Sequence, residues 1–265
     1  MVQSASGRIT RYVRYEQEGA VFYGILEGET IAQIEGGLFG KRQRTGTTVK
    51  LQDVRLRYPC EPEKILCVGL NYKSHLGSRG VPERPEIFYK PLTALLDPEG
   101  EIVIPPDSKD LHYEGELVVV IGKTARRIPP QNAPGCIFGF TCGNDVSERN
   151  WQHGSQGGPP DKQWWRAKGS DTFGPLGPAI VTGLDYGKSR LRTRLNGEVK
   201  QSQLVSDLIF GPNEIVSYVS QYVTLRPGDV IYTGTPGSTS AMKPRDVVEV
   251  EIDGIGILRN TVSAV

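Results

Sequence analysis

The sequence predicts an α+β fold that is mostly β, with few short helices and a small β-rich unit at the N-terminus. Glycine (32) and proline (19) together make up about a fifth of the 265 residues, which favours many turns. Short apolar runs rich in β-branched residues recur along the chain, as is typical of strands. Only residues 213–222 show clear helical periodicity. These three observations predict a β-dominated architecture.

The N-terminal part is expected to form a separate β-rich domain over residues 1–58. Residues 12–15 and 21–26 have the short alternating pattern of strands. Gly19 lies between the two runs and Gly28 after the second, and both glycines are turn signals. Residues 55–63, which contain Pro59 and Pro62, are predicted to be a linker. The chain is then expected to continue as one larger domain over residues 59–265.

In the larger domain, strands are predicted at residues 64–69, 86–90, 117–121, after 133–143, and at 179–181, 190–195, 230–233, 247–252 and 255–259. The helix at 213–222 places four apolar side chains along one face: Ile215, Val216, Val219 and Tyr222. Residues 71–76 favour a short helix or turn, and 151–165 a long loop. Residues 79–84 are expected to form a mobile loop able to close over a site.

The composition excludes several classes of function. A net charge of +1 gives no electrostatic basis for binding nucleic acid or an anionic membrane. No apolar run is long enough to span a bilayer, and residues 1–9 lack the apolar core of a signal peptide. We therefore expect a cytoplasmic protein whose four cysteines are reduced and act as small buried hydrophobes. None of them has the spacing of a zinc ribbon.

Two carboxylates precede an apolar strand and a third follows another. Glu114 and Glu116 are two residues apart, so on a strand they point to the same face. Asp145 follows the apolar run 137–141. Carboxylates held this close repel unless a cation lies between them, and oxygen ligands suit Mg²⁺ or Mn²⁺ better than zinc. The alternative is that both glutamates lie on the solvent face of a half-exposed sheet.

Other polar residues are candidates of lower specificity. His75 follows a buried strand and has the side chain best suited to carry protons near neutral pH, although most single histidines are structural. Lys90 and Lys168 could contact a substrate or lie on the surface. Arg149 and Gln152 follow Asp145 at offsets of four and seven, which predicts one shared helical face. Thr235 lies in a turn whose N–H groups could face an anion.

Together these segments resemble the fumarylacetoacetate hydrolase family, in order, over about residues 64–262. The matching stretches are Val68-Gly-Leu-Asn-Tyr-Lys-Ser-His75, Phe88-Tyr-Lys-Pro91, His112-Tyr-Glu-Gly-Glu-Leu-Val-Val-Val-Ile-Gly122, Asn144-Asp-Val-Ser-Glu-Arg-Asn-Trp-Gln152, Ala167-Lys-Gly-Ser-Asp-Thr-Phe-Gly-Pro175, Asn196-Gly-Glu198 and Gly228-Asp-Val-Ile-Tyr-Thr-Gly-Thr-Pro236. The set is specific, whereas any single stretch is not.

The resemblance implies a rolled mixed β-sheet with few helices, a homodimer and a small 2-oxo acid as substrate. It implies Glu114, Glu116 and Asp145 as ligands of Mg²⁺, with Mn²⁺ as the alternative. It also implies His75 and Lys168 as catalytic residues. It implies Arg149, Gln152 and Thr235 as substrate-binding residues, and Lys90, which lies in the matching stretch 88–91, is predicted to bind substrate with them.

One departure from the family pattern bears on the reaction. Many members carry a glutamate three residues after the histidine, where this chain has Ser78, so the machinery that activates water is incomplete. Glu83 or Glu86 would have to reach back from the loop to replace it. The resemblance ranks C–C hydrolysis of an acylpyruvate first, and isomerisation, tautomerisation or decarboxylation of an oxaloacetate-like acid as the alternative. A non-catalytic protein that binds a metal–oxoacid complex is a minor alternative.

Overall fold

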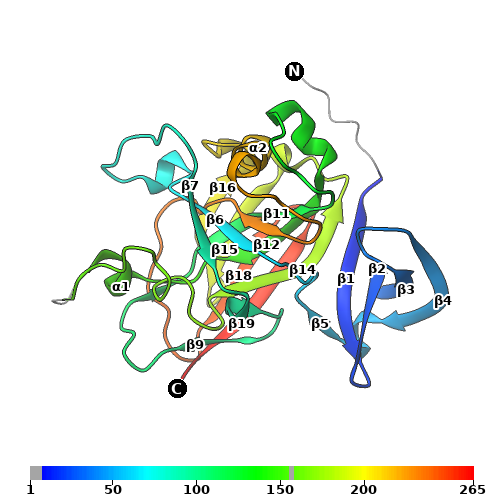
Figure 1. Cartoon of the computed structure of the whole chain (residues 1–265). Helices are drawn as coiled ribbons and strands as arrows, with labels where there is room; N and C mark the ends of the chain where they lie inside the picture. The colour runs from blue at the N-terminus through cyan, green and yellow to red at the C-terminus, as the bar shows by residue number, and fades with distance from the viewer. Residues whose placement is uncertain (1–7, 155–157) are drawn as a thin grey trace.

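The structure, a computed structural model, describes residues 8–154 and 158–265. It is built mostly from β-strands with few helices, as the sequence predicts (Figure 1). The predictions for residues 1–9 and 151–165 fall partly on residues 1–7 and 155–157, which lie outside the described part of the chain.

One sheet of twelve strands holds the N-terminal unit and the carboxylate-bearing strands together. Its main path runs β4-β3-β2-β1-β14-β12-β11-β17-β6-β7, with β5 beside β1 and β8 beside β14. The strands are β1 (Thr10–Gln17), β2 (Ala20–Glu27), β3 (Thr30–Gly36), β4 (Arg42–Lys50), β5 (Arg55–Arg57), β6 (Ile65–Gly69), β7 (Glu86–Lys90), β8 (Leu95–Leu96), β11 (Gly115–Ile121), β12 (Ile137–Asn144), β14 (Gly174–Thr182) and β17 (Val230–Tyr232).

A second sheet of five strands runs in the order β16-β15-β18-β19-β9. Its members are β9 (Glu101–Ile104), β15 (Arg190–Leu195), β16 (Glu198–Leu204), β18 (Val247–Ile252) and β19 (Gly256–Ala264). Strands β15 and β18 bury every second residue, so this sheet presents one face to the core and one toward solvent. A short pair joins β10 (Leu111–His112) to β13 (Ser147–Glu148).

Strand β11 lies in the middle of the core. All seven of its residues are buried, because β12 and β17 flank it and apolar side chains pack on both of its faces. This explains the uninterrupted run of apolar residues that the sequence shows there. Each fully buried valine or isoleucine contributes about 1.5–3 kcal/mol of transfer free energy, so the strand is a firm support for the carboxylates at its start.

Each predicted strand overlaps an observed one, but the sequence analysis missed eight strands: β3, β4, β5, β8, β9, β10, β13 and β16. Strand β4 shows why, because eight of its nine residues are exposed and it carries no alternating apolar pattern. The predicted linker at 55–63 is wrong at its start, since Arg55–Arg57 forms β5 and pairs with β1. Backbone pairing decides such strands, and local composition does not reveal it.

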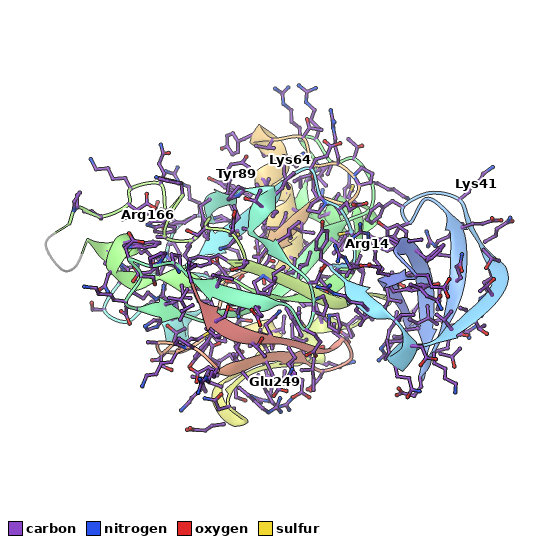
Figure 2. The ribbon with its side chains drawn as sticks, turned by 90° about the horizontal axis from the view of Figure 1, so that it is seen from below. Arg14, Lys41, Lys64, Tyr89, Arg166 and Glu249 are labelled. Carbon is purple, nitrogen blue, oxygen red and sulfur yellow. The ribbon has the colours of Figure 1, made fainter. Side chains whose placement is uncertain are left out.

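The N-terminal strands lie at one side of the molecule and join the large sheet through β1 (Figures 1 and 2). Tyr12 of β1 pairs with Ile180 of β14 and shares an apolar cluster with residues of β6 and β11. Arg14, labelled in Figure 2, lies on β1, and its guanidinium forms a 2.8 Å ion pair with Glu61. The division into domains at residue 58 remains a prediction.

Two α-helices are present in the described residues, α1 (Arg149–His153) and α2 (Pro212–Tyr222). Helix α2 confirms the prediction for 213–222 and buries Ile215, Val216 and Val219. Tyr222, predicted on the same face, is instead 78% exposed. Residues 73–75 form the short 3₁₀ turn expected after β6. Among the described residues, no helix has the length and apolar character needed to cross a bilayer.

The four cysteines, Cys60, Cys67, Cys136 and Cys142, are all free. Three of them are buried as predicted, whereas Cys136 is only partly buried.

Candidate metal centre and its cavity

Three carboxylates converge where β11 begins and β12 ends. Because Gly115 pairs with Asn144 across these antiparallel strands, Glu114 precedes and Asp145 follows the same rung of the ladder. The N–H of Asp145 donates to the carbonyl of Glu114 at 2.9 Å. Ligand oxygens of Glu114, Glu116 and Asp145 lie within 4.8 Å of one another, and each residue is at most 4% exposed. The solvent-face alternative for the two glutamates is therefore wrong.

The residue between the two glutamates has to be glycine. A Cβ on Gly115 would lie 2.0 Å from Thr193 Oγ1 of the neighbouring β15. The close approach of the two sheets at this point leaves no room for a side chain. It holds Glu114 and Glu116 against the core rather than at a sheet surface.

Glu116 is the least compensated of the three carboxylates. Burial, followed by the charges of Asp145 and Glu114, raises its pKa well above the ordinary value. A hydrogen bond from the N–H of Gly234 to Oε2, at 2.6 Å, opposes this shift without overcoming it. The same effects would be relieved by a cation placed among the three groups.

Glu114 behaves in the opposite way. Burial raises its pKa, but the charges of Lys168 and Arg149 outweigh burial and hold the pKa below its usual range. Its Oε1 accepts a hydrogen bond from Arg149, and its Oε2 accepts one from Lys168 at 2.7 Å. Glu114 is therefore a permanent anion at the centre of the site.

Lys168 is the cation closest to this cluster. Its ammonium donates to Glu114 Oε2, Asp145 Oδ2 and Ser147 Oγ, each at 2.7 Å. Burial lowers its pKa, but the charges of Asp145 and Glu114 reverse that effect and raise it overall. Lys168 thus stays charged and fixes two of the three carboxylates.

The residues present fit a divalent cation with hard oxygen ligands. Lys168 neutralises Glu114 and Asp145 in part, and Glu116 has no cationic side chain bonded to it among the described residues. Asp145 Oδ1 is buried with the Lys90 ammonium 2.6 Å away, so the carboxylate left without a cationic partner is that of Glu116. A buried carboxylate whose negative charge is not neutralised by a cationic side chain is unfavourable, and a bound metal ion would neutralise it.

Lys90 occupies a different place from the one predicted. Its side chain is fully buried, lies 2.6 Å from Asp145 Oδ1, and donates to the carbonyl oxygens of Lys168 and Phe173. It does not belong to the cavity wall that holds the carboxylates. The structure thus places Lys90 behind Asp145, where it orients that carboxylate and the backbone of Lys168 instead of facing a substrate.

Arg149 and Gln152 come together on α1, but Asp145 is not on that helix. Strand β13 intervenes, and the side chain of Glu148 caps α1 by accepting from the N–H of Trp151 at 2.6 Å. The prediction of one helical face for all three is therefore wrong. Arg149 Nη1 donates to Gln152 Oε1 at 2.7 Å, and Nη2 donates to Glu114 and to Thr239.

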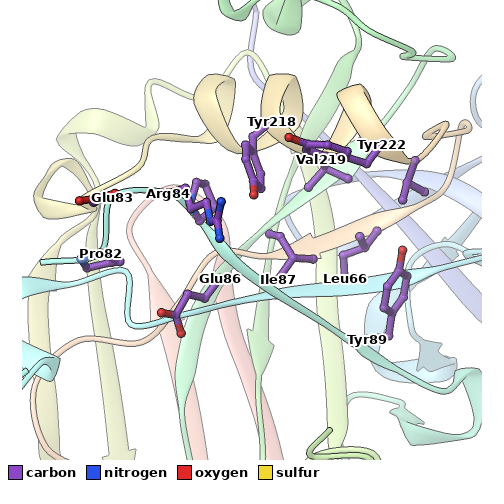
Figure 3. Close-up of a pocket in the computed structure, with 12 residues that line it drawn as sticks. Leu66, Pro82, Glu83, Arg84, Glu86, Ile87, Tyr89, Tyr218, Val219 and Tyr222 are labelled. Carbon is purple, nitrogen blue, oxygen red and sulfur yellow. The ribbon is translucent and has the colours of Figure 1, made fainter.

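His75 lies at the edge of the same cavity. Its Nδ1 is 2.5 Å from the carbonyl oxygen of Gly237, and its Nε2 is 3.8 Å from Glu114 Oε1. Since a carbonyl oxygen can only accept, the hydrogen of the neutral ring is on Nδ1 and Nε2 carries the lone pair. Neither Glu83 nor Glu86 replaces the missing dyad glutamate, because both line a separate groove beside α2 (Figure 3).

Thr235 lies in the cavity wall with its hydroxyl already engaged. It donates to the carbonyl of Gly115 at 2.9 Å and accepts from Gln201 Nε2 at 2.8 Å. Gln201, from β16, was not found by sequence reasoning. Its Oε1 accepts from the N–H of Gly115 at 3.2 Å, so one side chain ties Thr235 to the strand of the two glutamates.

These groups enclose a cavity of about 360 Å³. Eight of the nine predicted site residues line it, namely His75, Glu114, Glu116, Asp145, Arg149, Gln152, Lys168 and Thr235. A larger groove of about 690 Å³ lies elsewhere, between α2 and β7, and holds none of them. We assign the site to the smaller cavity because the buried charges converge there.

Comparison with known proteins places this geometry in context. A family model described as fumarylacetoacetate (FAA) hydrolase C-terminal matches residues 64–263, and a second, Rv2993c-like N-terminal, matches residues 10–59. Protein Rv2993c of Mycobacterium tuberculosis is 40% identical over 264 residues, which cover 95% of this chain and 97% of that protein. The mitochondrial oxaloacetate tautomerase FAHD2A of Bos taurus is 41% identical over 213 residues, covering 76% and 67% respectively.

Among solved structures, the 2-hydroxyhepta-2,4-diene-1,7-dioate isomerase of Mycobacterium marinum superposes with a TM-score of 0.89. It is 39% identical, and the match covers 96% of this chain and 98% of that one.

Proposed function

Because this chain belongs to the fumarylacetoacetate hydrolase family, we propose that it is a metal-dependent isomerase that interconverts the keto and enol forms of a small oxaloacetate-like 2-oxo acid. The tautomerase and the diene-dioate isomerase named above support this choice. They favour the isomerase alternative of the sequence analysis over C–C hydrolysis, which was ranked first there.

The surroundings of His75 are the observation on which this proposal depends. In the described residues, the one carboxylate within 4 Å of its ring is Glu114, which is already bound by Lys168 and Arg149. Hydrolysis needs an imidazolium stabilised while water attacks, and this chain offers no free acid for that purpose. Keto–enol interconversion transfers one proton between a carbon and the neighbouring 2-oxo oxygen, and the lone pair on Nε2 can accept that proton from the carbon and release it to the oxygen.

The remaining residues of the cavity bind and orient. Glu114, Glu116 and Asp145 would hold the Mg²⁺ or Mn²⁺ ion, which when bound supplies Lewis-acid stabilisation of negative charge on a 2-oxo oxygen. Lys168 adds a fixed positive charge beside that position, and pre-organised charges of this kind lower the barrier without reorganisation. Arg149 and Gln152, locked to each other, present N–H groups to the polar ends of the substrate.

The proposal is tested by following the enol absorbance of oxaloacetate in the presence of Mg²⁺, with pyruvate and CO₂ measured in parallel. We expect rapid equilibration of the enol without either product. Cleavage of an acylpyruvate to pyruvate and a free acid, with no effect on oxaloacetate, would establish the hydrolase instead. Formation of pyruvate and CO₂ would establish the decarboxylase.

Lys168→Met separates an enzyme from a protein that only binds the metal–acid complex. Loss of a fixed charge at a reacting oxygen should lower turnover by about 10²–10³-fold. The metal should still bind, because all three carboxylates remain. Wild-type turnover in this variant would contradict the role given to Lys168. Absence of turnover in the wild type on both oxaloacetate and the acylpyruvate would favour the binding protein.

The homodimer implied by the family and the cytoplasmic location also remain predictions. Light scattering of the purified chain tests the homodimer.

A further inference from the structure

Arg79 is part of the cavity wall although sequence reasoning gave it no role. It lies in the irregular segment between the 3₁₀ turn at 73–75 and β7, and lines the same cavity as the three carboxylates. The cavity has a buried end and an exposed end. Glu114, Glu116 and Lys168 are at most 4% exposed, whereas residues 77–79 are exposed. Arg79 therefore marks the open side of the cavity, away from the buried carboxylates.

The charge of Arg79 is not used by the protein. Arg149 and Lys168, the other cationic side chains of the wall with permanent charge, are both bound to Glu114. Within the described ranges, Arg79 forms no ion pair with any carboxylate. A guanidinium presents five donors in a fixed fork that matches a carboxylate, so a free one at the mouth of an anion-binding cavity is available for a ligand.

His153 lines the same cavity as Arg79 and lies within electrostatic reach of its charge. Burial lowers its pKa, and the charges of Arg149 and Arg79 lower it further. His153 is thus a neutral hydrogen-bonding group on which the charges of Arg149 and Arg79 outweigh that of Glu114.

The sum of charges favours a ligand with two negative groups. Three carboxylates in the wall face three permanently cationic side chains, and Lys90 adds one more positive charge behind Asp145. A divalent ion on the carboxylates then leaves an excess of at least two positive charges. A 2-oxo monoacid neutralises one of them and a diacid neutralises two. The volume of about 360 Å³ is near the small end of the usual range of roughly 300–1,000 Å³ for ligand sites.

We propose that Arg79 is a specificity-determining residue that binds a second carboxylate of the substrate, so that the site prefers 2-oxo diacids to 2-oxo monoacids. This inference rests on the proposed function, because it names the substrate class of the same cavity. The metal-binding end of the ligand occupies the buried carboxylates, and the distal carboxylate pairs with the guanidinium at the open side, with His153 as a neutral neighbour.

Mg²⁺-dependent binding of oxaloacetate and of pyruvate, measured by calorimetry, tests the assignment, since the two acids differ only by the second carboxylate. The wild type should bind oxaloacetate more tightly. Arg79→Leu should weaken oxaloacetate about 10- to 100-fold, the range of a lost charge-assisted hydrogen bond, and change pyruvate less than twofold. Arg79→Lys should retain part of the preference. Arg84→Leu is the matched control and should alter neither acid, because Arg84 lines the separate groove.

The enol assay on the same variants separates the two proposals. If the wild type equilibrates the enol but Arg79→Leu binds both acids as the wild type does, the role of Arg79 is wrong and the isomerase survives. If the preference for the diacid is present and is lost in Arg79→Leu while no enol is equilibrated, Arg79 is confirmed and the isomerase is wrong. Equal weakening of both acids, or no preference in the wild type, overturns the role of Arg79.

Discussion

The protein has two hollows of contrasting character, and the smaller one has the features of an active site. The groove between α2 and β7 has nearly twice the volume of the carboxylate cavity. Its charged residues, Glu83, Arg84 and Glu86, are exposed and form no ion pair within the described part of the chain (Figure 3). In the cavity, by contrast, every permanently charged side chain except Arg79 forms an ion pair or a hydrogen bond with another described residue. Volume alone therefore does not locate function, whereas buried charges that converge do.

The largest effect expected from this contrast is on the metal. Glu116→Gln removes the carboxylate that no cationic side chain compensates. We expect affinity for Mg²⁺ to fall at least about 100-fold, because the loss of groups that only support a ligand already costs about 10–100-fold. Glu86→Gln makes the same change in the groove and should leave metal affinity and turnover as in the wild type. Calorimetric titration of the metal-free variants with Mg²⁺ measures both.

The same pair of variants tests the electrostatic reason. The amide of Glu116→Gln is uncharged, which relieves repulsion among the three buried acids, so the metal-free variant should have a Tm no lower than the metal-free wild type. Retained Mg²⁺ affinity in Glu116→Gln, or a loss of affinity in Glu86→Gln, would mean that the ion is bound elsewhere.

A smaller effect on metal affinity and turnover is expected for Gln201, which supports the predicted metal ligands without being one of them. Gln201→Leu removes the acceptor of the Gly115 N–H and the donor to Thr235 Oγ1, so the glutamate-bearing segment loses an anchor. We expect a decrease of about 10–100-fold in metal affinity or turnover, as for other supporting groups around a metal. Gln203→Leu is the control, because Gln203 lies on the same strand and bonds Asp207 at the surface.

Gln201 must also be separated from a purely structural residue. If it acts by positioning, the activity lost in Gln201→Leu should be recovered in part at high Mg²⁺ concentration, and Gln201→Glu should retain the bond to the N–H of Gly115. A loss that Mg²⁺ does not relieve, accompanied by a matching loss of stability, would assign Gln201 to the core.

The site residues that the sequence revealed and those it concealed differ in how their contacts arise. Glu114 and Glu116 could be placed on one face from the period of a strand, and the family motifs supplied the rest. Gln201 comes from a strand 86 residues beyond Gly115, and no local pattern marks a glutamine that will be buried by tertiary pairing. Arg79 is an ordinary exposed loop arginine until the cavity beside it is known.

The errors have a similar cause. Lys90 was expected to face the substrate, but strand β7 directs its side chain into the protein, behind Asp145. Asp145 was expected on the helix of Arg149, but the two-residue strand β13 pairs with β10 and breaks the helical offset. The type and order of the apolar strands and of α2 followed from local sequence, whereas the exposed or very short strands and the directions of side chains at the junctions depended on long-range pairing.

The smallest effect is expected in the groove itself. Tyr222 is 78% exposed, so Tyr222→Phe should change the free energy of unfolding by no more than about 0.5 kcal/mol and leave turnover unchanged. Tyr232→Phe is the matched change in the core, where the hydroxyl donates to the carbonyls of Gly174 and Pro175. Loss of that buried partner should cost about 1–3 kcal/mol, or several degrees in Tm. If Tyr222→Phe instead cost as much as Tyr232→Phe, the tyrosine would have to be covered in solution, and the groove would count as an interface and not as open surface.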